Sequence, residues 1–384
     1  MRILVIAPFP YGTDRGSPIR ARRLVELARR AGHDVRVVSY HAARPGEGVR
    51  RGALPLAITR QGFSLRKLPC DADLLRLAVQ EARSFRPDVL DGHVHEGLAL
   101  ALATRRLAAP SARVIYNAHG TLADELVVSG VLRRGGRGHR LALATEQALV
   151  ARADAVLAQS AHRAAEIAAA GQQCVHVLPD APEPGMFPVR RDPAFRALFA
   201  PPDRPLAVYT GSFDTYQGVD DILAAAELTP HVHYLLFGSP SGDYARRAKA
   251  PSLQGRVQVV DPAPYADLPA VLAAADLALA PRHYGGNIPG KVPAYLAAGL
   301  PVVGTDVAGI RELVDGQVGA VVGVGDVAAL ARAIDTLAHD DSSLLRAGQA
   351  AARRAAALYG EDALLTAMAA AYGEPAARSL TDAA

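Results

Sequence analysis

The sequence predicts an α/β protein made of two doubly wound domains. Short apolar segments alternate with segments of helical periodicity up to about residue 178, and a second series of the same kind begins at residue 206. Residues 179–205, between the two series, are rich in proline, which is typical of an interdomain linker. A chain of 384 residues is long enough for two domains that each bury a core.

The first series begins with an apolar segment at residues 2–7, a loop containing Gly12 and Gly16, a helical segment and a strand at residues 35–39. This is the order of a βαβ unit in a parallel sheet. The dinucleotide-binding pattern G-x-G-x-x-G is absent from it. Residues 41–69 contain several prolines and glycines, and we expect a surface excursion or a short hairpin there.

Asp71 and Asp73 follow this excursion in the pattern D-x-D, which is known from metal sites. They stand directly before a segment of helical periodicity, however, and carboxylates in the first turn of a helix complement its dipole. We therefore expect the pair to open a helix rather than to bind a metal.

The next two strands of the first series lead to histidines. The earlier one leads to His93, His95 and Glu96, and the later one ends at His119. Two histidines beside a glutamate imitate a metal site, but alternation along a strand would point both histidines to one face and Glu96 to the other. We expect these side chains to line a ligand cleft instead.

The second series contains strands at residues 206–210, 231–237, 257–260 and 276–280. A loop with Gly285, Gly286 and Gly290 follows the last of these, and a helix of small and apolar residues runs from Lys291 to Gly299. Backbone N–H groups in such a loop favour an anion such as phosphate. An ordinary β-α-β crossover with tight turns explains the same spacing, so both interpretations stay open.

Charge is unevenly divided along the chain. Residues 1–180 hold 26 Lys and Arg against 16 Asp and Glu, and the remainder holds 16 against 22. The basic first half is compatible with an acidic acceptor or an anionic membrane face, and equally with arginines on solvated helix faces. Because the basic residues are not interleaved with aromatic ones, we do not expect nucleic-acid binding.

The two cysteines, Cys70 and Cys174, lie far apart and give neither a metal-ligand spacing nor a disulfide framework. No apolar stretch is long enough for a transmembrane helix. The apolar N-terminal segment is too short for a signal peptide and is typical of a buried strand. These features predict a cytoplasmic protein, with a peripheral position at the inner membrane face as an open alternative.

A longer motif lies between Ala280 and Glu312. It has the form P-x-K-x-x-x-Y-x-A-x-G-x-P-V-V followed by G-x-x-E, in which the matching residues are Pro289, Lys291, Tyr295, Ala297, Gly299, Pro301, Val302, Val303, Gly309 and Glu312. The segment resembles the donor-sugar segment of the retaining glycosyltransferases of family 4. The first loop, A-P-F-P-x-G…R-G-S-P-x-R, and the segment P-D-V-L-D-G-H-V-H resemble that family as well.

The resemblance implies the GT-B fold, in which two Rossmann-like doubly wound domains face a cleft. It divides the chain into an acceptor-side domain at residues 1–180, a linker at 181–205 and a nucleotide-sugar-binding domain at 206–360. The remainder, 361–384, would be a helix that crosses back to the first domain, with a tail.

The resemblance also implies an activity, the transfer of a hexose from a nucleotide diphosphate sugar with retention of configuration. We expect a UDP-sugar rather than a GDP-sugar, and a glycan, a glycolipid or another lipid-linked sugar, or a small molecule as acceptor. In such enzymes catalysis consists largely of positioning the reactants and stabilising the diphosphate leaving group. No metal and no other cofactor is expected.

The site residues that follow from the resemblance fall into three groups. The catalytic residues are His119 and Lys291. The donor-binding residues are Gly16, Gly211, Ser212, Gln217, Gly218, Arg282, Gly285, Gly286, Asn287, Ile288 and Glu312. The acceptor-side residues are Arg15, Arg20, His93, His95, Glu96, Asp124 and Glu125.

The sequence departs from the family pattern at two places. Ser212 and Gln217 stand where many relatives carry an arginine and a lysine that grip the diphosphate, and Gly286 and Ala294 replace a pair of glutamates. Leaving-group stabilisation would then fall to Lys291, with the arginines near the two glycine loops.

These departures keep two alternatives open. One is a catalytically silent GT-B subunit that binds a nucleotide sugar. The other is a GT-B sugar-nucleotide epimerase, which needs acids and bases in the cleft. Asp91, Glu96, Asp124 and Glu125 are the carboxylates available for that role.

Overall fold

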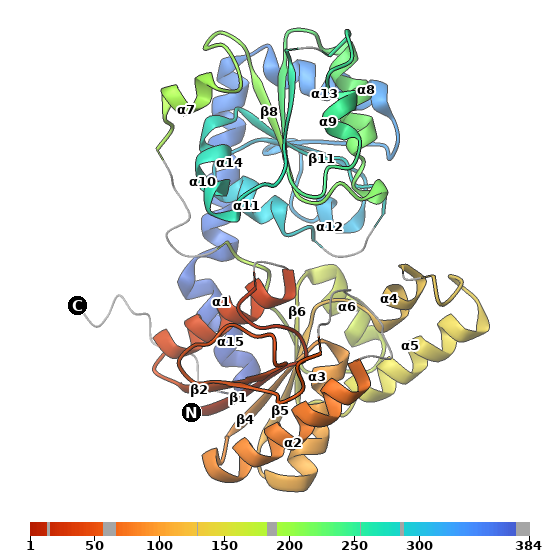
Figure 1. Ribbon diagram of the computed structural model, residues 1–384, viewed down its shortest axis with the longest axis vertical. Coiled ribbons are helices and arrows are strands. Elements are labelled where there is room, and N and C mark those ends of the chain that lie inside the picture. Colours follow the sequence, from red (N-terminus) through yellow and green to blue (C-terminus); the bar gives the residue numbers. More distant parts are fainter. Residues whose placement is uncertain are drawn as a thin grey trace. The chain divides into compact units, whose positions relative to one another are not determined.

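The computed structural model of the protein describes residues 1–13, 16–56, 67–128, 130–182, 190–253, 255–284 and 288–373. The chain forms two compact units (Figure 1). The first consists of Met1–Pro179 together with Glu361–Ala384, and the second of Asp180–Gly360.

The first unit contains a seven-stranded sheet in the order β3-β2-β1-β4-β5-β6-β7, and all neighbouring strands are parallel. The strands are β1 (Arg2–Ala7), β2 (Asp34–Ser39), β3 (Val49–Arg51), β4 (Val89–His93), β5 (Arg113–Ala118), β6 (Ala155–Ala158) and β7 (Val175–Val177). The strand order reverses between β1 and β4. In open α/β sheets, ligands bind outside the carboxyl ends of the strands at such a point.

In the described residues of this unit, seven helices flank the sheet. They are α1 (Gly16–Arg30), α2 (Lys67–Phe85), α3 (Val94–Ala108), α4 (Leu122–Val128), α5 (Arg137–Val150), α6 (Ala161–Ala169) and α15 (Glu361–Tyr372). The central strands are buried on both faces, which explains their continuous apolar sequences. Helix α15 contacts α1 and β5–β7, and its Tyr372 hydroxyl donates a 3.0 Å hydrogen bond to Oδ2 of Asp91 in β4.

The second unit contains a six-stranded parallel sheet in the order β10-β9-β8-β11-β12-β13. The strands are β8 (Leu206–Thr210), β9 (His233–Phe237), β10 (Val257–Val260), β11 (Leu277–Ala280), β12 (Val302–Thr305) and β13 (Gly319–Val322). Its helices are α7 (Pro193–Ala197), α8 (Val219–Leu228), α9 (Tyr244–Arg247), α10 (Leu268–Ala274), α11 (Lys291–Ala297), α12 (Ala308–Arg311), α13 (Val327–Ala338) and α14 (Asp341–Tyr359), with short 3₁₀ turns η1 (Thr215–Gln217) and η2 (Tyr265–Asp267).

Residues alternate along β8 between two cores, one on each face of this sheet. Leu206 and Val208 pack with α10, α11 and α14, whereas Ala207 and Tyr209 pack with α8, α9 and α13. Figure 1 shows the two sets of helices on opposite sides of the strands. The period of two follows from strand geometry, in which successive side chains point to opposite faces.

The structure changes several local expectations. The excursion after β2 does not form a hairpin in its described part, because β3 pairs with β2 in parallel. Asp73 does not open a helix either, since α2 begins at Lys67. Its Oδ2 instead accepts hydrogen bonds from the backbone N–H groups of Ala53 and Leu54, so this carboxylate holds the preceding loop.

The proline-rich segment 181–205 contains helix α7, which packs against the second unit. Arg196 of α7 donates hydrogen bonds of 3.0 Å to the carbonyl of Ala274 and 2.7 Å to that of Arg204, and it pairs with Asp276 at 3.0 Å. This part of the segment is therefore anchored to the second sheet.

Candidate functional site

The loops after β8 and β11 lie against each other at the carboxyl ends of these strands. Gly218, which precedes α8, has φ of 71°, and a Cβ atom there would lie 1.9 Å from the carbonyl oxygen of Pro281. Only glycine permits this backbone contact. The backbone N–H of His283 also donates a 2.8 Å hydrogen bond to the carbonyl of Tyr216, so two short loops are joined into one surface.

Lys291, the first residue of α11, reaches this surface with its ammonium group. Its Nζ donates a 3.1 Å hydrogen bond to Oε1 of Gln217 and lies 3.8 Å from the centroid of the Tyr209 ring. A Cβ atom on Gly211 would come within 3.0 Å of the same Nζ, so the glycine leaves room for it. The contacts fix one cation among a neutral amide, an aromatic face and a glycine backbone.

Burial, and then the positive charge of Arg282, lower the pKa of Lys291 well below its ordinary value. Burial also lowers the pKa of Arg282, whose guanidinium carbon lies 5.2 Å from the centroid of the Tyr216 ring. Burial is the largest cause of both shifts and disfavours the charged forms. A bound anion would favour the charged form of both side chains.

The motif tyrosine, Tyr295, has a structural role beside this surface. Its hydroxyl accepts a 2.8 Å hydrogen bond from the backbone N–H of Thr210 and lies 3.1 Å from the Thr210 hydroxyl. Tyr295 therefore ties α11 to the end of β8, and this tie positions Lys291 beside Gln217.

The remaining donor-side predictions have different surroundings. Ser212 donates its hydroxyl hydrogen to Asp214 at 2.7 Å, Ile288 is buried, and Glu312 is exposed at the end of α12. Gly16 begins α1 in the first unit, and a Cβ atom there would meet nothing within 4 Å. Gly285, Gly286, Asn287 and Arg15 lie outside the residues that the structure describes.

Three aromatic residues at this surface did not emerge from the sequence. Tyr209 supports the Lys291 ammonium, and the rings of Tyr216 and Tyr284 lie 5.2 Å apart. Tyr284 is 50% exposed. A tyrosine beside a glycine loop carries no signal by itself, because only the tertiary structure brings the loops together.

In the first unit, the structure brings His93 and His119 into direct contact. Nδ1 of His93 lies 2.9 Å from Nε2 of His119, and the ring of Phe9 is 6.2 Å from the first imidazole and 6.1 Å from the second. Burial, followed by the nearby His93 and Arg20, lowers the pKa of His119 well below its ordinary value. The His119 ring is therefore neutral at physiological pH and can donate or accept a hydrogen bond.

Two further residues surround this histidine pair. Nε2 of His93 lies 3.6 Å from Oδ2 of Asp91, and the neighbouring Arg20 donates a 2.9 Å hydrogen bond from Nε to Oδ1 of Asn117. Arg20 and Asp91 are both almost completely buried. These contacts hold the histidine pair at the carboxyl ends of β4 and β5.

The expected placement of His95 and Glu96 on one strand is wrong. Strand β4 ends at His93, and helix α3 begins at Val94, whose φ is 54°. Glu96 consequently pairs with Lys67 at 2.9 Å and with His95 at 3.1 Å. His93 and His95 turn to different partners, and they do not converge on one metal position.

Glu125 lies on α4 and is half-buried. Burial, reinforced by the negative charge of Glu96, raises its pKa to about 7. Asp124 precedes it in the same helix, but its side chain lies outside the described part of the structure.

Comparisons with known proteins define the class to which these two units belong. The sequence model described as Glycosyltransferase Family 4 matches residues 15–181, and that described as Glycosyl transferases group 1 matches residues 204–340. The protein is thus a glycosyltransferase with the GT-B fold, as the sequence predicted. The chain belongs to glycosyltransferase family 4.

Curated relatives and solved structures agree with this assignment. The chain is 27% identical to phosphatidyl-myo-inositol mannosyltransferase from Mycolicibacterium smegmatis, with 91% of this chain and 88% of the relative covered. It is 26% identical to glycogen synthase from Mycobacterium tuberculosis, with 96% and 86% covered.

Among solved structures, sucrose-phosphate synthase from Thermosynechococcus elongatus has a TM-score of 0.80 at 20% identity, with both chains covered completely. Alr3699/HepE from Anabaena in complex with UDP-glucose has a TM-score of 0.71 at 18% identity, with 96% of this chain and 98% of the other covered. Within the described residues, no helix is both long and apolar enough to cross a membrane.

Proposed function

We propose that this glycosyltransferase moves a hexose from a nucleotide diphosphate sugar, with UDP preferred to GDP, and that Lys291 is its main diphosphate contact. The observation that supports the proposal is the position of the Lys291 ammonium between Gln217, Tyr209 and Gly211. The Lys291 ammonium has no carboxylate partner among its described contacts. A diphosphate would supply the missing negative charge.

Gln217 takes a supporting role in this proposal. Its amide oxygen accepts the hydrogen bond from Lys291, so the side chain orients the ammonium although it carries no charge itself. Charge-assisted hydrogen bonds are roughly twice as strong as neutral ones. Lys291, with Arg282 near Tyr216, would therefore supply most of the leaving-group stabilisation that relatives obtain from the positions of Ser212 and Gln217.

Two fixed cations at the diphosphate also support a reaction without a metal ion, because they can neutralise the charge that develops on the leaving group. We further propose retention of configuration through same-face substitution, for which no protein nucleophile is needed. His119 would contact the donor sugar through its neutral imidazole, and His93 would hold that ring in place.

We propose one of three classes of acceptor: a glycan, a lipid-linked acceptor or a small molecule. The names of the relatives correspond to the first two of these classes, since one is a phosphatidyl-myo-inositol mannosyltransferase and another a glycogen synthase. The solved complex of Alr3699/HepE with UDP-glucose supports a uridine donor by analogy. A lipid-linked acceptor would also give the basic first half of the chain a reason to contact an anionic membrane surface.

Calorimetric titration with UDP, GDP and TDP, each with and without EDTA, tests the donor. We expect micromolar binding of UDP that EDTA leaves unchanged and that Lys291→Ala weakens by about 100-fold, as expected for a lost charge-assisted contact. Lys249→Ala, which removes an exposed lysine of the same unit, is the matched control and should bind normally.

Turnover of UDP-glucose then separates the alternatives. Release of UDP, accelerated by an acceptor, supports the transferase. UDP binding without any turnover would point to a silent subunit, and conversion to an epimeric UDP-sugar without acceptor would point to an epimerase. Equal binding by Lys291→Ala and wild type would refute the role given to Lys291.

A further inference from the structure

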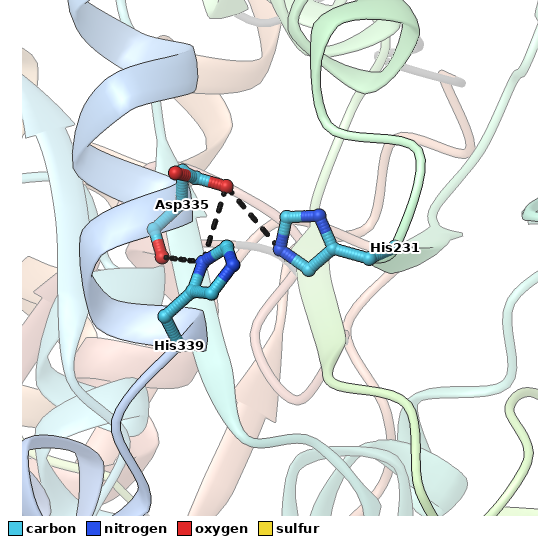
Figure 2. Close-up of side chains that lie close together, drawn as sticks. All are labelled: His231, Asp335 and His339. Carbon is cyan, nitrogen blue, oxygen red and sulfur yellow. Dashed lines mark hydrogen bonds and ion pairs between the residues drawn. The ribbon is translucent and has the colours of Figure 1, made fainter.

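A second group of polar side chains lies in the second unit, away from the loops that carry Lys291. His231 stands on the turn between α8 and β9, Asp335 lies in α13, and His339 follows that helix directly. Figure 2 shows both imidazoles directed at the Asp335 carboxylate. The turn precedes β9, so the group lies at the amino end of that strand, whereas Lys291 lies among loops at the carboxyl ends.

The distances within the group are those of a metal-ligand set. Nε2 of His231 and Nδ1 of His339 each lie 3.3 Å from Oδ1 of Asp335. One donor atom of each residue lies within 4.8 Å of the others. Tetrahedral Zn²⁺ with ligands at about 2.0 Å places neighbouring ligand atoms about 3.3 Å apart, so the three side chains need little movement to share one ion.

The backbone that carries His231 is held firmly. Nη1 of Arg256 donates hydrogen bonds to the carbonyls of Ala226, Thr229 and Val232, at 3.0, 3.3 and 3.4 Å. The Thr229 hydroxyl adds a 2.8 Å hydrogen bond to the carbonyl of Ala225. A ligand on such a braced turn loses little conformational freedom when an ion binds.

The other two ligands are fixed by helix α13. Asp335 and His339 are four residues apart, which places them on one face of a helix. The opposite face of α13 is anchored in the core through Leu330 and Ile334. Nδ1–H of His339 also donates a 2.9 Å hydrogen bond to the backbone carbonyl of Asp335, which orients the ring. An ion bound at Nδ1 would displace this hydrogen, and the proton would then reside on Nε2.

The group is accessible from solvent and includes one carboxylate. The exposed fractions of the side chains are 26% for His231, 47% for Asp335 and 63% for His339, so an ion can enter from solvent. Arg204 and Arg256 lie near His231 and oppose a cation, whereas Asp335 attracts it.

We propose that His231, Asp335 and His339 form a binding site for a divalent transition-metal ion of the Zn²⁺ type, with water in the fourth position. Two imidazoles and one carboxylate are ligands that such ions prefer to Mg²⁺ or Ca²⁺. The ion would tie the α8–β9 turn to the end of α13. Because the site lies at the amino end of β9, its role is structural and independent of the proposed sugar transfer.

Zn²⁺ titration of the full-length, metal-stripped protein tests the site, with a chromophoric chelator as competitor. We expect one Zn²⁺ ion to bind tightly to each chain, and the Tm to rise when this site is saturated. Co²⁺, used as a spectroscopic probe, should give the visible absorption of a four-coordinate site. His231→Gln and Asp335→Asn should each weaken the binding by about 100-fold or more, since even outer contacts of a metal site are worth 10- to 100-fold.

The chain offers a matched control in helix α6. His162 and Glu166 are also four residues apart, with Nε2 and Oε1 3.4 Å from each other, and both are about half exposed. His162→Gln should leave the tight Zn²⁺ binding intact, because this pair has no third ligand among the described residues. Zn²⁺ binding that is equally tight in wild type and His231→Gln, or that is lost only in His162→Gln, would overturn the proposal. The proposal would also be overturned if the wild type bound no Zn²⁺ ion tightly.

Discussion

The Nζ atom of Lys291 donates a 3.1 Å hydrogen bond to Oε1 of Gln217, which stands where the resemblance to the family implies a lysine. The two side chains come from different loops, one after β11 and the other after β8. A cation at position 217 would stand directly beside the Lys291 ammonium. The glutamine therefore makes an attractive contact where a second cation would be repelled.

This relationship predicts opposite effects for Gln217→Lys without and with a nucleotide. Without one, the second ammonium lies close to the first in a partly buried place, and we expect a lower Tm. With UDP, both cations can contact the diphosphate, so the rise in Tm on adding UDP should be larger than in wild type. Thermal denaturation with and without UDP measures both effects.

Gln317→Lys is the control for this experiment, because Gln317 is exposed and far along the chain from either loop. It adds the same charge to the same unit and should change neither Tm nor the UDP response. A UDP-dependent rise in Gln217→Lys that is smaller than in wild type would contradict the proposed diphosphate position.

The depressed pKa of Lys291 predicts a pH dependence of stability. The unfolded chain binds this proton up to about pH 10.5, whereas the folded chain releases it at a lower pH. Between the two values the unfolded state holds more protons, so the free energy of unfolding rises with pH. Lys291→Met should remove this contribution, and its stability relative to wild type should therefore fall from about pH 7 to about pH 10.

Urea unfolding at these two pH values measures the difference, with Lys249→Met as a control that removes an exposed lysine. Saturating UDP should flatten the wild-type dependence, because a bound diphosphate raises the pKa of Lys291. If the free energy of unfolding changed with pH equally in wild type and Lys291→Met, the Lys291 ammonium would not be desolvated in the folded protein.

The sequence predicted the fold class and the family because both depend on patterns that survive without tertiary information. Apolar strands and glycine turns recur along the sequence, and the motif around Lys291 has a recognisable spacing. The alternation of strands and helices in two series predicted both sheets. The contact between Lys291 and Gln217 depends instead on two loops that lie far apart in sequence. No local pattern encodes it.

Other differences arise at the boundaries of elements. His95 and Glu96 were expected on a strand, but the chain turns into α3 immediately after His93, and one residue of error moves a side chain to another face. Asp73 was expected at a helix start, but α2 begins earlier, and the carboxylate serves the loop before it. Local propensity does not fix such boundaries, because tertiary contacts decide between neighbouring positions.

The contact between Gly218 and Pro281 predicts a large effect for Gly218→Ala. The added Cβ would lie 1.9 Å from the Pro281 carbonyl oxygen, so the two loops must separate. Gly242→Ala is the matched control, because Gly242 also has a positive φ, 56°, but a Cβ there would meet nothing within 4 Å. We expect Gly242→Ala to lower the free energy of unfolding by about 1–2 kcal/mol through backbone strain alone. Gly218→Ala should lower it by a distinctly larger amount.

Urea unfolding compares the two variants, and UDP titration shows whether separation of the loops reaches the donor site. Gly218→Ala should lose UDP binding, whereas Gly242→Ala should keep it. If both variants lost a similar free energy of unfolding, the two loops would separate freely. The proposal that these loops hold Lys291 beside Gln217 would then be wrong.

The carboxyl of Glu125 makes the first unit less stable as the pH rises. Its pKa is about 7 in the folded chain, against an ordinary value of 4.5, because burial and the charge of Glu96 oppose ionisation. Between these values the folded state keeps a proton that the unfolded state has lost, so stability falls through this window. Glu125→Gln should be close to wild type at about pH 4.5 and more stable at about pH 8, by up to about 3 kcal/mol.

Thermal denaturation at the two pH values tests this expectation, and Glu47→Gln, at an exposed glutamate, controls for the loss of one negative charge. The same titration has a consequence for ligands. A hydroxyl-bearing acceptor that contacts Glu125 would meet a protonated, hydrogen-donating carboxyl below about pH 7 and an accepting carboxylate above it. A pH dependence of acceptor KM that disappears in Glu125→Gln would place the acceptor beside α4, and an unchanged dependence would place it elsewhere.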